Sequence, residues 1–179
     1  MAQRVASTAE KYGADVRLRH VAETAPREAV ESVDAWREHA AEMEGQPTAD
    51  PEDLAWADVV LMGSPTRYGH VTSQLQSFID QLGPLWQEGK LADKAYAAFT
   101  SSQTLHGGQE STILAMLTTF CHLGGIIVPP GYTDQSKFDD GNPYGVSVVA
   151  DADGLDDTAR TALDHLVTRV LDVAQRLAA

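Results

Sequence analysis

The chain has 179 residues, 43% of them hydrophobic, and carries a formal net charge of −13 at pH 7. This length and composition predict a packed globule of one domain, residues 1–179, rather than a disordered segment. The negative charge argues against a nucleic-acid backbone or an anionic membrane as partner, because both need a clustered cationic face.

Targeting signals are not evident in the sequence. No apolar run approaches the ~20 residues of a membrane-spanning helix, and no charged start with an apolar stretch marks a signal peptide. The expected location is the cytoplasm. The single cysteine, Cys121, excludes an intrachain disulfide and a cysteine-rich zinc site. It lies in the apolar stretch TTFCHLGG, which predicts a buried, unreactive thiol.

The first part of the chain mixes helical and strand-like patterns. Apolar residues recur at near-helical spacing from the start, and Gly13 ends that helix. Residues 16–21 (VRLRHV) alternate like a half-buried strand, and residues 30–43 show a second helical pattern. Asp50 before Pro51 predicts a capped helix N-terminus.

The remainder alternates strands and helices more regularly. The predicted elements are a buried strand at 58–63, a helix at 72–82 ended by Gly83, a strand at 94–100, a helix at 109–123 ended by Gly124 and Gly125, a short strand at 126–130, an irregular excursion at 131–151 and a helix at 156–177. This rhythm predicts an α/β fold, a doubly wound parallel sheet between two layers of helices.

The first helical pattern has no strand before it. In a doubly wound sheet the first strand is normally central, and its following loop binds phosphate at a helix N-terminus. We therefore expect this strand and loop to be missing from the given sequence. A fold that starts with a helix is the alternative.

Two polar loops, at residues 64–70 and 101–108, follow predicted parallel strands. Ligands of open parallel sheets bind beyond the carboxyl ends of the strands. Pro65 and the glycines let backbone approach a flat ring, Tyr68 can stack on it, and Arg67 can neutralise its charge. Both loops therefore suit a large planar heterocycle with hydrogen-bond acceptors along its edge.

Several stretches together, GSPTRYGH, SQLQSFIDQLGPLW, GGQE, PPGY and GNPYG, resemble the WrbA family of NAD(P)H:quinone oxidoreductases. The resemblance covers most of the chain from Val16 onward. It implies a flavodoxin-like fold, FMN as cofactor, NADH or NADPH as co-substrate and a small-molecule quinone as substrate. It also implies two-electron quinone reduction by ping-pong hydride transfer, in a homotetramer with active sites at subunit contacts.

The resemblance assigns roles to individual residues. Those matching the flavin-binding loops are Thr66, Arg67 and Tyr68 in the first loop and Ser101, Ser102, Gln103, Thr104, Leu105 and Gly107 in the second. His122 matches a histidine that reaches the flavin from a neighbouring subunit, and Trp86 matches an aromatic wall where quinone or nicotinamide stacks. Arg67 would stabilise charge on the ring, and His122 or Tyr68 would relay protons, which makes these three the catalytic candidates.

Each assignment has a plain structural alternative. Arg67 could be a surface or interface cation, Trp86 could pack a helix end, and His122 could be a core histidine. For the whole protein, the alternatives are a flavodoxin-type electron carrier without a substrate site or a truncated chain unable to hold FMN. The other histidines carry no pairing pattern and are expected at the surface, His165 among them. No motif predicts a metal site.

Overall fold

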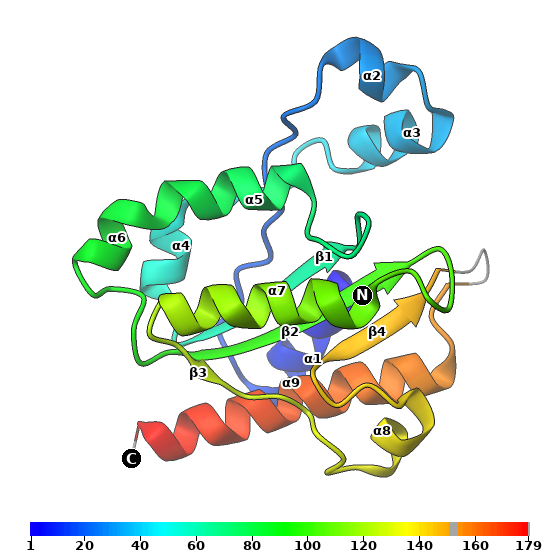
Figure 1. Ribbon diagram of the computed structural model, residues 1–179. Helices are drawn as coiled ribbons and strands as arrows, with labels where there is room; N and C mark the ends of the chain where they lie inside the picture. The colour runs from blue at the N-terminus through cyan, green and yellow to red at the C-terminus, as the bar shows by residue number, and fades with distance from the viewer. Residues whose placement is uncertain (151–153, 179) are drawn as a thin grey trace.

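The computed structural model describes residues 1–150 and 154–178. Its described residues form a four-stranded parallel sheet between helices (Figure 1). β2 (Ala95–Ser102) is central and pairs along its length with β1 (Val59–Pro65). On its other edge, β3 (Ile126–Ile127) pairs with the start of β2 and β4 (Val146–Val149) with its end. The predicted parallel sheet is confirmed.

Alternate residues of β2 face two separate hydrophobic cores. Tyr96 and Ala98 belong to one core, while Ala97 and Phe99 belong to the other. The side chains of a strand alternate between the two faces of the sheet, and β2 is buried on both. A strand of this kind needs helices on both sides, and the structure supplies them.

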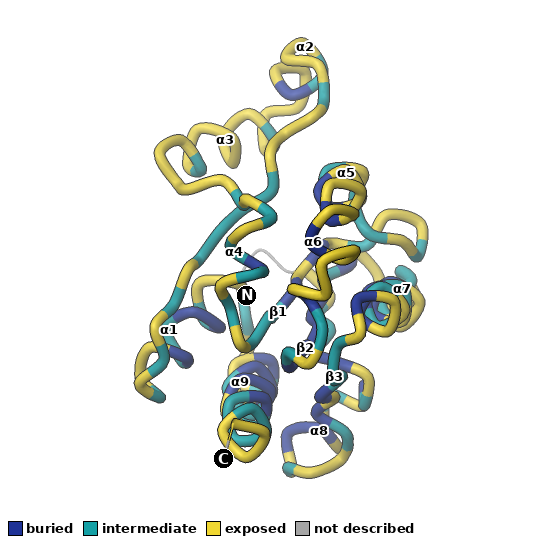
Figure 2. The backbone as a smooth tube through the Cα atoms, turned by 90° about the vertical axis from the view of Figure 1, so that its left-hand side faces the viewer, coloured by how far each residue is buried: buried dark blue, intermediate teal, exposed yellow. Residues whose placement is uncertain are grey.

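The helices divide between the two faces, as Figure 2 shows from the side. One layer holds α5 (Ser73–Ile79), the 3₁₀ turn η1 (Asp80–Leu82), α6 (Gly83–Gln87) and α7 (Gln109–His122); the other holds α1 (Ala2–Tyr12) and α9 (Asp157–Leu177). α4 (Pro51–Trp56) leads into β1, and α8 (Gln135–Asp140) packs beside α9. α2 (Arg27–Glu31) and α3 (Asp34–Glu42) project from the body (Figure 1).

Local capping signals place several helix ends where the sequence predicts them. Gly13 ends α1 in a left-handed conformation with φ 101°, and Gly124 follows α7 with φ 76°. Asp50 caps α4 by accepting from the backbone N–H of Glu52 at 2.9 Å. At α9, Asp156 accepts from the N–H of Ala159 at 2.7 Å. These capping interactions involve only residues close together in the chain, so the sequence predicts them well.

Three predicted elements are wrong in detail. Residues 16–21 form no strand, and their one β-bridge joins His20 to Thr48. A strand needs a hydrogen-bonded neighbouring strand, which an alternating sequence pattern alone does not provide. Gly83 does not end a helix, since its φ and ψ are both −49° and it opens α6 before Pro84. The pattern at 30–43 is two helices, α2 and α3, with Ser32 and Val33 between them.

Two further expectations need correction. The excursion at 131–151 contains both α8 and β4, so it contributes a strand to the sheet. Cys121 is exposed rather than buried, because the apolar stretch around it is helical and turns this position away from the core. None of the helices among the described residues combines the length and the apolar run needed to cross a bilayer.

Candidate functional site

The first polar loop turns back on itself directly after β1. The N–H of Arg67 donates to the carbonyl of His70 at 2.8 Å, and the N–H of His70 donates to the carbonyl of Arg67 at 3.0 Å. Tyr68 lies at the tip with φ 52°, a left-handed conformation that a residue with a Cβ rarely adopts. Its side chain is fully exposed. Such strained positions concentrate at functional sites.

The second polar loop follows β2 and is held by its own hydrogen bonds. The hydroxyl of Ser102 donates to the carbonyl of Thr104 at 2.8 Å, and Nε2 of Gln109 donates to the same carbonyl at 2.9 Å. Leu105 lies at the outside of the loop with 75% of its surface exposed. The loop therefore presents an apolar side chain above a polar backbone.

The structure brings the two loops into contact. The N–H of Thr66 donates to the carbonyl of Ser101 at 2.8 Å, and its hydroxyl donates to the carbonyl of Gly107 at 3.2 Å. A Cβ added to Gly108 would lie 2.6 Å from the Cα of Gly69, so glycine is required for the loops to approach this closely. The predicted residues of both loops thus form one surface at the carboxyl end of the sheet.

The loop surface combines exposed apolar groups with one available cation. Tyr68 and Leu105 are both exposed, although most large apolar side chains of this chain are at least partly covered. Arg67 has no carboxylate within 4 Å among the described residues, and Nη1 donates to the carbonyl of Thr66 at 3.0 Å. An aromatic ring, an aliphatic side chain and a guanidinium fit a flavin ring, which is flat and largely apolar and becomes anionic when it is reduced.

One residue that supports this surface from below is not predicted by the sequence analysis. Thr112, on the first turns of α7, is fully buried, and its hydroxyl lies 2.8 Å from both Oγ1 of Thr66 and the carbonyl of Gly108. The hydroxyl therefore joins the first loop to the helix that follows the second. The sequence signal is weak, because a threonine four residues after a helix-opening glycine is common.

Trp86 and His122 lie together, away from the loops. Nε1 of Trp86 donates to the carbonyl of His122 at 2.8 Å, and both residues line a cavity of about 370 Å³. His122 ends α7, whereas the two loops adjoin its start; a 14-residue helix is about 20 Å long. Because His122 is exposed, the alternative of a core histidine is wrong. Within one chain, neither side chain reaches the loop surface.

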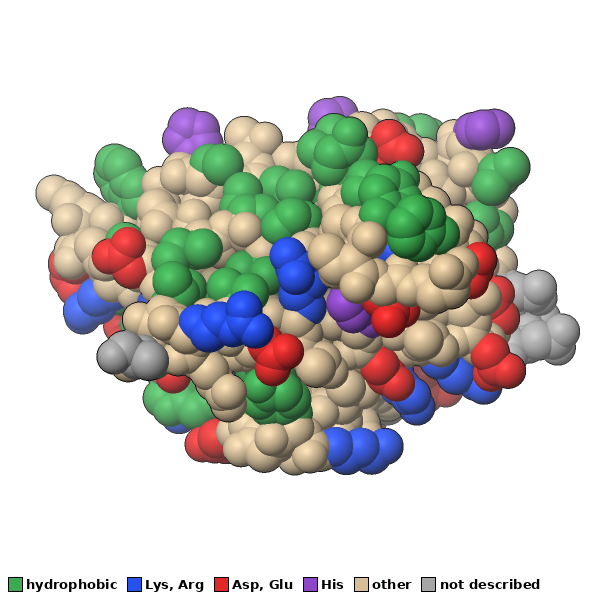
Figure 3. All heavy atoms as spheres, turned by 90° about the horizontal axis from the view of Figure 1, so that it is seen from below, with side chains coloured by type: hydrophobic (Ala, Val, Ile, Leu, Met, Phe, Trp, Pro, Cys, Tyr) green, Lys and Arg blue, Asp and Glu red, His purple; other side chains and the backbone are tan. Residues whose placement is uncertain are grey.

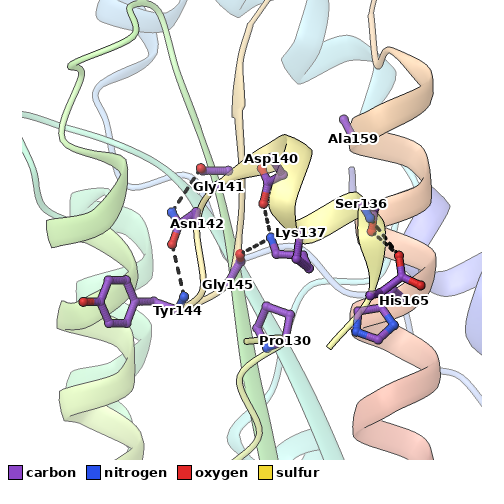
Figure 4. Close-up of polar contacts among 12 residues, drawn as sticks. Pro130, Ser136, Lys137, Asp140, Gly141, Asn142, Tyr144, Gly145, Ala159 and His165 are labelled. Carbon is purple, nitrogen blue, oxygen red and sulfur yellow. Dashed lines mark hydrogen bonds and ion pairs between the residues drawn. The ribbon is translucent and has the colours of Figure 1, made fainter. Parts of the chain in front are cut away.

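A buried lysine fixes the segment before β4 (Figure 4). Lys137 is fully buried and pairs with Asp140, and its ammonium also donates to the carbonyl of Gly145 at 2.9 Å. Burial lowers the pKa of Lys137 to about 8. A Cβ on Gly145 would overlap the carbonyl of Ala98, so this segment packs directly on β2.

Comparisons with known proteins agree with the geometry of the fold. The family described as NADPH-dependent FMN reductase matches residues 1–138. The chain is 44% identical over 178 residues to an NAD(P)H dehydrogenase (quinone) of Deinococcus radiodurans, covering 99% of this chain and 89% of the relative. It is 41% identical to a protein of the same description in Sinorhizobium fredii, covering 92% and 82% of the two chains.

Solved structures show the same arrangement of sheet and helices. A flavodoxin, WrbA-like protein from Agrobacterium tumefaciens superimposes with a TM-score of 0.56 at 24% identity, covering 70% of this chain and 71% of that one. A flavodoxin of Fusobacterium nucleatum with flavin mononucleotide bound gives 0.50 at 11% identity, covering 85% and 92%. The chain therefore has the flavodoxin-like α/β fold.

Proposed function

Because the chain belongs to the NADPH-dependent FMN reductase family, we propose that residues 64–70 and 101–108 hold the flavin ring of FMN in an NAD(P)H:quinone oxidoreductase. The relative from Deinococcus radiodurans, an NAD(P)H dehydrogenase (quinone), is 44% identical, and the chain spans 89% of its length. The observation that carries the proposal is the junction of the two loops through Thr66, which exposes Tyr68 beside Arg67.

Residues of the two loops would contact the flavin through backbone and side chain. The residues that we assign to this contact are Pro65, Thr66, Arg67, Tyr68, Ser101, Ser102, Gln103, Thr104, Leu105 and Gly107. Tyr68 would stack on or beside the ring, and backbone N–H groups would donate to its edge. The guanidinium of Arg67 would neutralise negative charge at that edge, which costs little here because no carboxylate competes among the described residues.

FMN, when bound, supplies hydride transfer from NADH or NADPH and on to a quinone. The protein would provide one flat slot above the ring, which the nicotinamide and the quinone occupy one after the other. Tyr68 is placed to border such a slot, because its exposed side chain stands clear of the loop. Its phenol O–H can hold a proton near a quinone oxygen.

We assign Trp86 and His122 to the active site of a second copy of the chain. They are adjacent and border the cavity of about 370 Å³, but they lie at the far end of α7 from Arg67. A second subunit whose α7 end meets the loops would bring an imidazole and an aromatic wall to the ring. A homotetramer with sites at subunit contacts satisfies this requirement, and the slot would then be complete only in the assembly.

The flavin assignment is tested by titrating the protein with FMN and following NADH or NADPH oxidation with benzoquinone. We expect saturable FMN binding, quinone-dependent turnover and a large loss of FMN affinity in Arg67→Ala. Arg160→Ala is the matched control, since Arg160 pairs with Asp157 on the first turn of α9. FMN-saturated protein that oxidises neither nicotinamide would overturn the enzyme assignment.

The shared site is tested by mixing two inactive variants. Arg67→Ala damages the loop surface, and His122→Ala damages the group donated to the neighbouring chain. If sites are shared, assemblies refolded from a mixture contain some sites with both residues intact and regain activity. Activity no higher in the mixture than in either variant alone contradicts the shared site, while leaving the flavin assignment standing.

A further inference from the structure

A second concave site lies on α9, away from the loop surface. Its cavity of about 150 Å³ is lined by His165, Arg169, Asp172 and Arg176 of α9 and by Thr133 of the segment before α8. Figure 3 looks at the molecule from below and shows basic, histidine and acidic side chains near the middle of the face, beside hydrophobic ones. Neither the family comparison nor the proposed function gives these residues a role.

The basic residues share one face of α9 by their spacing. His165, Arg169 and Arg176 lie at positions i, i+4 and i+11, which a helix of 3.6 residues per turn places along one stripe. Two guanidinium groups and an imidazole therefore border one cavity. Clustered cations repel one another unless an anion lies between them.

The arginines of this cavity lack the partners that other arginines have. Six of the nine arginines pair with a carboxylate: Arg4, Arg17, Arg19, Arg27, Arg37 and Arg160. Among the described residues the other three, Arg67, Arg169 and Arg176, have none within 4 Å. With 26 acidic residues in the chain, two such arginines in one cavity are notable. Arg67 already has an assigned anionic ligand, the flavin ring.

The one carboxylate in the cavity is engaged elsewhere. Asp172 accepts a hydrogen bond from the phenol of Tyr12 on α1, and this bond raises the pKa of Tyr12. Although Asp172 is three residues from Arg169 and four from Arg176, it forms an ion pair with neither. Asp172 keeps its negative charge, but the two guanidinium groups outnumber it, so the lining of the cavity has a net positive charge.

Neutral contacts orient the rest of the site. Nε of Arg169 donates to the carbonyl of Pro129 at 2.9 Å, which holds the half-buried side chain and leaves its two terminal nitrogens to donate. The hydroxyl of Thr133 donates to the carbonyl of Pro130 at 2.7 Å, and Nε2 of His165 lies 2.8 Å from the same hydroxyl. The site thus joins α9 to the segment after β3, and its free donors are the terminal nitrogens of the guanidinium groups. This donor set matches the acceptor oxygens of a phosphate group.

We propose that this cavity binds a phosphate group, either inorganic phosphate or the phosphomonoester of a small metabolite. The guanidinium groups of Arg169 and Arg176 hold the oxyanion from two sides, and Thr133 and His165 border it. Because Arg169 is also bonded to the carbonyl of Pro129, phosphate bound to it would reinforce the contact between α9 and the segment after β3. Binding only to the folded chain then stabilises the protein.

The test uses the FMN-saturated full chain, so that the flavin site does not compete for phosphate. Thermal unfolding is followed in potassium phosphate and in potassium chloride at equal ionic strength, which separates specific binding from screening. At phosphate concentrations of about 100 times the Kd, the unfolding midpoint should rise on the order of 5 °C. Glycerol 3-phosphate, titrated in parallel, represents the phosphomonoesters.

The decisive variant is the double substitution Arg169→Gln with Arg176→Gln, and Arg160→Gln on the same helix is its control. Phosphate should raise the midpoint of wild type and control alike and leave the double variant unchanged. Arg169→Lys keeps the charge but loses the planar fork, so binding should weaken about tenfold. Folding of every variant is verified by FMN binding and circular dichroism in chloride.

Two results would overturn the proposal: an equal phosphate effect in the double variant, or no specific effect in wild type. Tighter binding of glycerol 3-phosphate would identify the ligand as a phosphomonoester, and tighter binding of inorganic phosphate would identify the free ion. Quinone reductase activity is measured separately, and its failure would leave the phosphate result intact, because the cavity shares no residue with the loops.

Discussion

The hydroxyl of Thr112 lies 2.8 Å from Oγ1 of Thr66, and this contact joins the loop after β1 to the helix after β2. Thr112 is fully buried, so its position is set by packing rather than by solvent. Thr66 also accepts a hydrogen bond from the N–H of Gly69 at 3.2 Å. The two loops that we propose to hold the flavin are therefore positioned by a buried side chain that need not contact it.

Thr112→Val should weaken FMN binding while leaving the fold intact. Valine keeps the shape but removes the hydroxyl, so Thr66 loses a partner and the first loop loses an anchor. A lost hydrogen bond of this kind costs about 1 kcal/mol, which is roughly a fivefold rise in the Kd for FMN. Thr161→Val, whose exposed hydroxyl bonds to the carbonyl of Asp157 on α9, should leave the Kd unchanged. Equal Kd values for both variants would contradict the role of Thr112.

Tyr68→Gly and Tyr68→Ala should separate strain from stacking. Glycine adopts the left-handed conformation at φ 52° without strain, whereas alanine does not. The free energy of unfolding of Tyr68→Gly should therefore be about 1 kcal/mol higher than that of Tyr68→Ala. Both variants lose the ring, and both should bind FMN and quinone more weakly than Tyr68→Phe. Urea unfolding and flavin titration measure the two effects separately. The prediction fails if Tyr68→Ala is as stable as Tyr68→Gly.

Gly63→Ala should destabilise the sheet. An added Cβ would overlap the ring of Phe99 on the paired strand β2, and overpacking of this kind costs about 1–3 kcal/mol. Gly83→Ala is the control, because no atom lies within 4 Å of the new methyl and the backbone there is helical. Denaturant unfolding should show a lower midpoint for the first variant alone.

Asp53→Asn should remove a part of the stability that depends on pH. Burial alone would raise the pKa of Asp53, but hydrogen bonds from the N–H of Asp50 and from Arg17 and Arg19 lower it below its ordinary value. A carboxylate with a lowered pKa stabilises the fold above its unfolded-state pKa of about 4, and this contribution disappears as pH falls through its folded-state pKa.

The expected cost of Asp53→Asn near neutral pH is about 1–2 kcal/mol, from the lost capping and charged hydrogen bonds. The difference from wild type should shrink as the pH is lowered below about 4. Urea unfolding across this range measures it. Asp34→Asn serves as control, since its pair with Arg37 is exposed, and a constant difference for Asp53→Asn would contradict the assigned pKa direction.

Lys137→Met should destabilise the segment before β4 by about 3–5 kcal/mol, because it leaves the buried carboxylate of Asp140 unpaired. The double variant Lys137→Met with Asp140→Leu removes both charges and should recover much of that loss. Unfolding free energies of the two single variants and the double variant form the test. A double variant no more stable than Lys137→Met would show that the pair is not the source of the cost.

Local features of this protein were readable from sequence. The Asp50 cap, the left-handed Gly13 and the apolar strand β1 depend on a few neighbouring residues, and each lies where it was predicted, although β1 is only partly buried. The two polar loops were also identified in advance, because the carboxyl ends of parallel strands necessarily share one edge of the sheet. Helical spacing also places His165, Arg169 and Arg176 along one side of α9. The sequence does not show, however, that neither arginine forms an ion pair with a carboxylate of the described residues.

The sequence by itself determined the alternation of strands and helices from β1 to α7, the last helix and several caps, since these properties are encoded within a turn or two of chain. Tertiary structure decided which distant groups meet. Only folding brings the hydroxyl of Thr112 to Thr66 and the carboxylate of Asp172 to the phenol of Tyr12. Folding also separates Trp86 and His122 from Arg67. It leaves residues 16–21 without a paired strand. Such contacts join residues far apart in the chain, where side-chain direction and packing, not periodicity, set the distance.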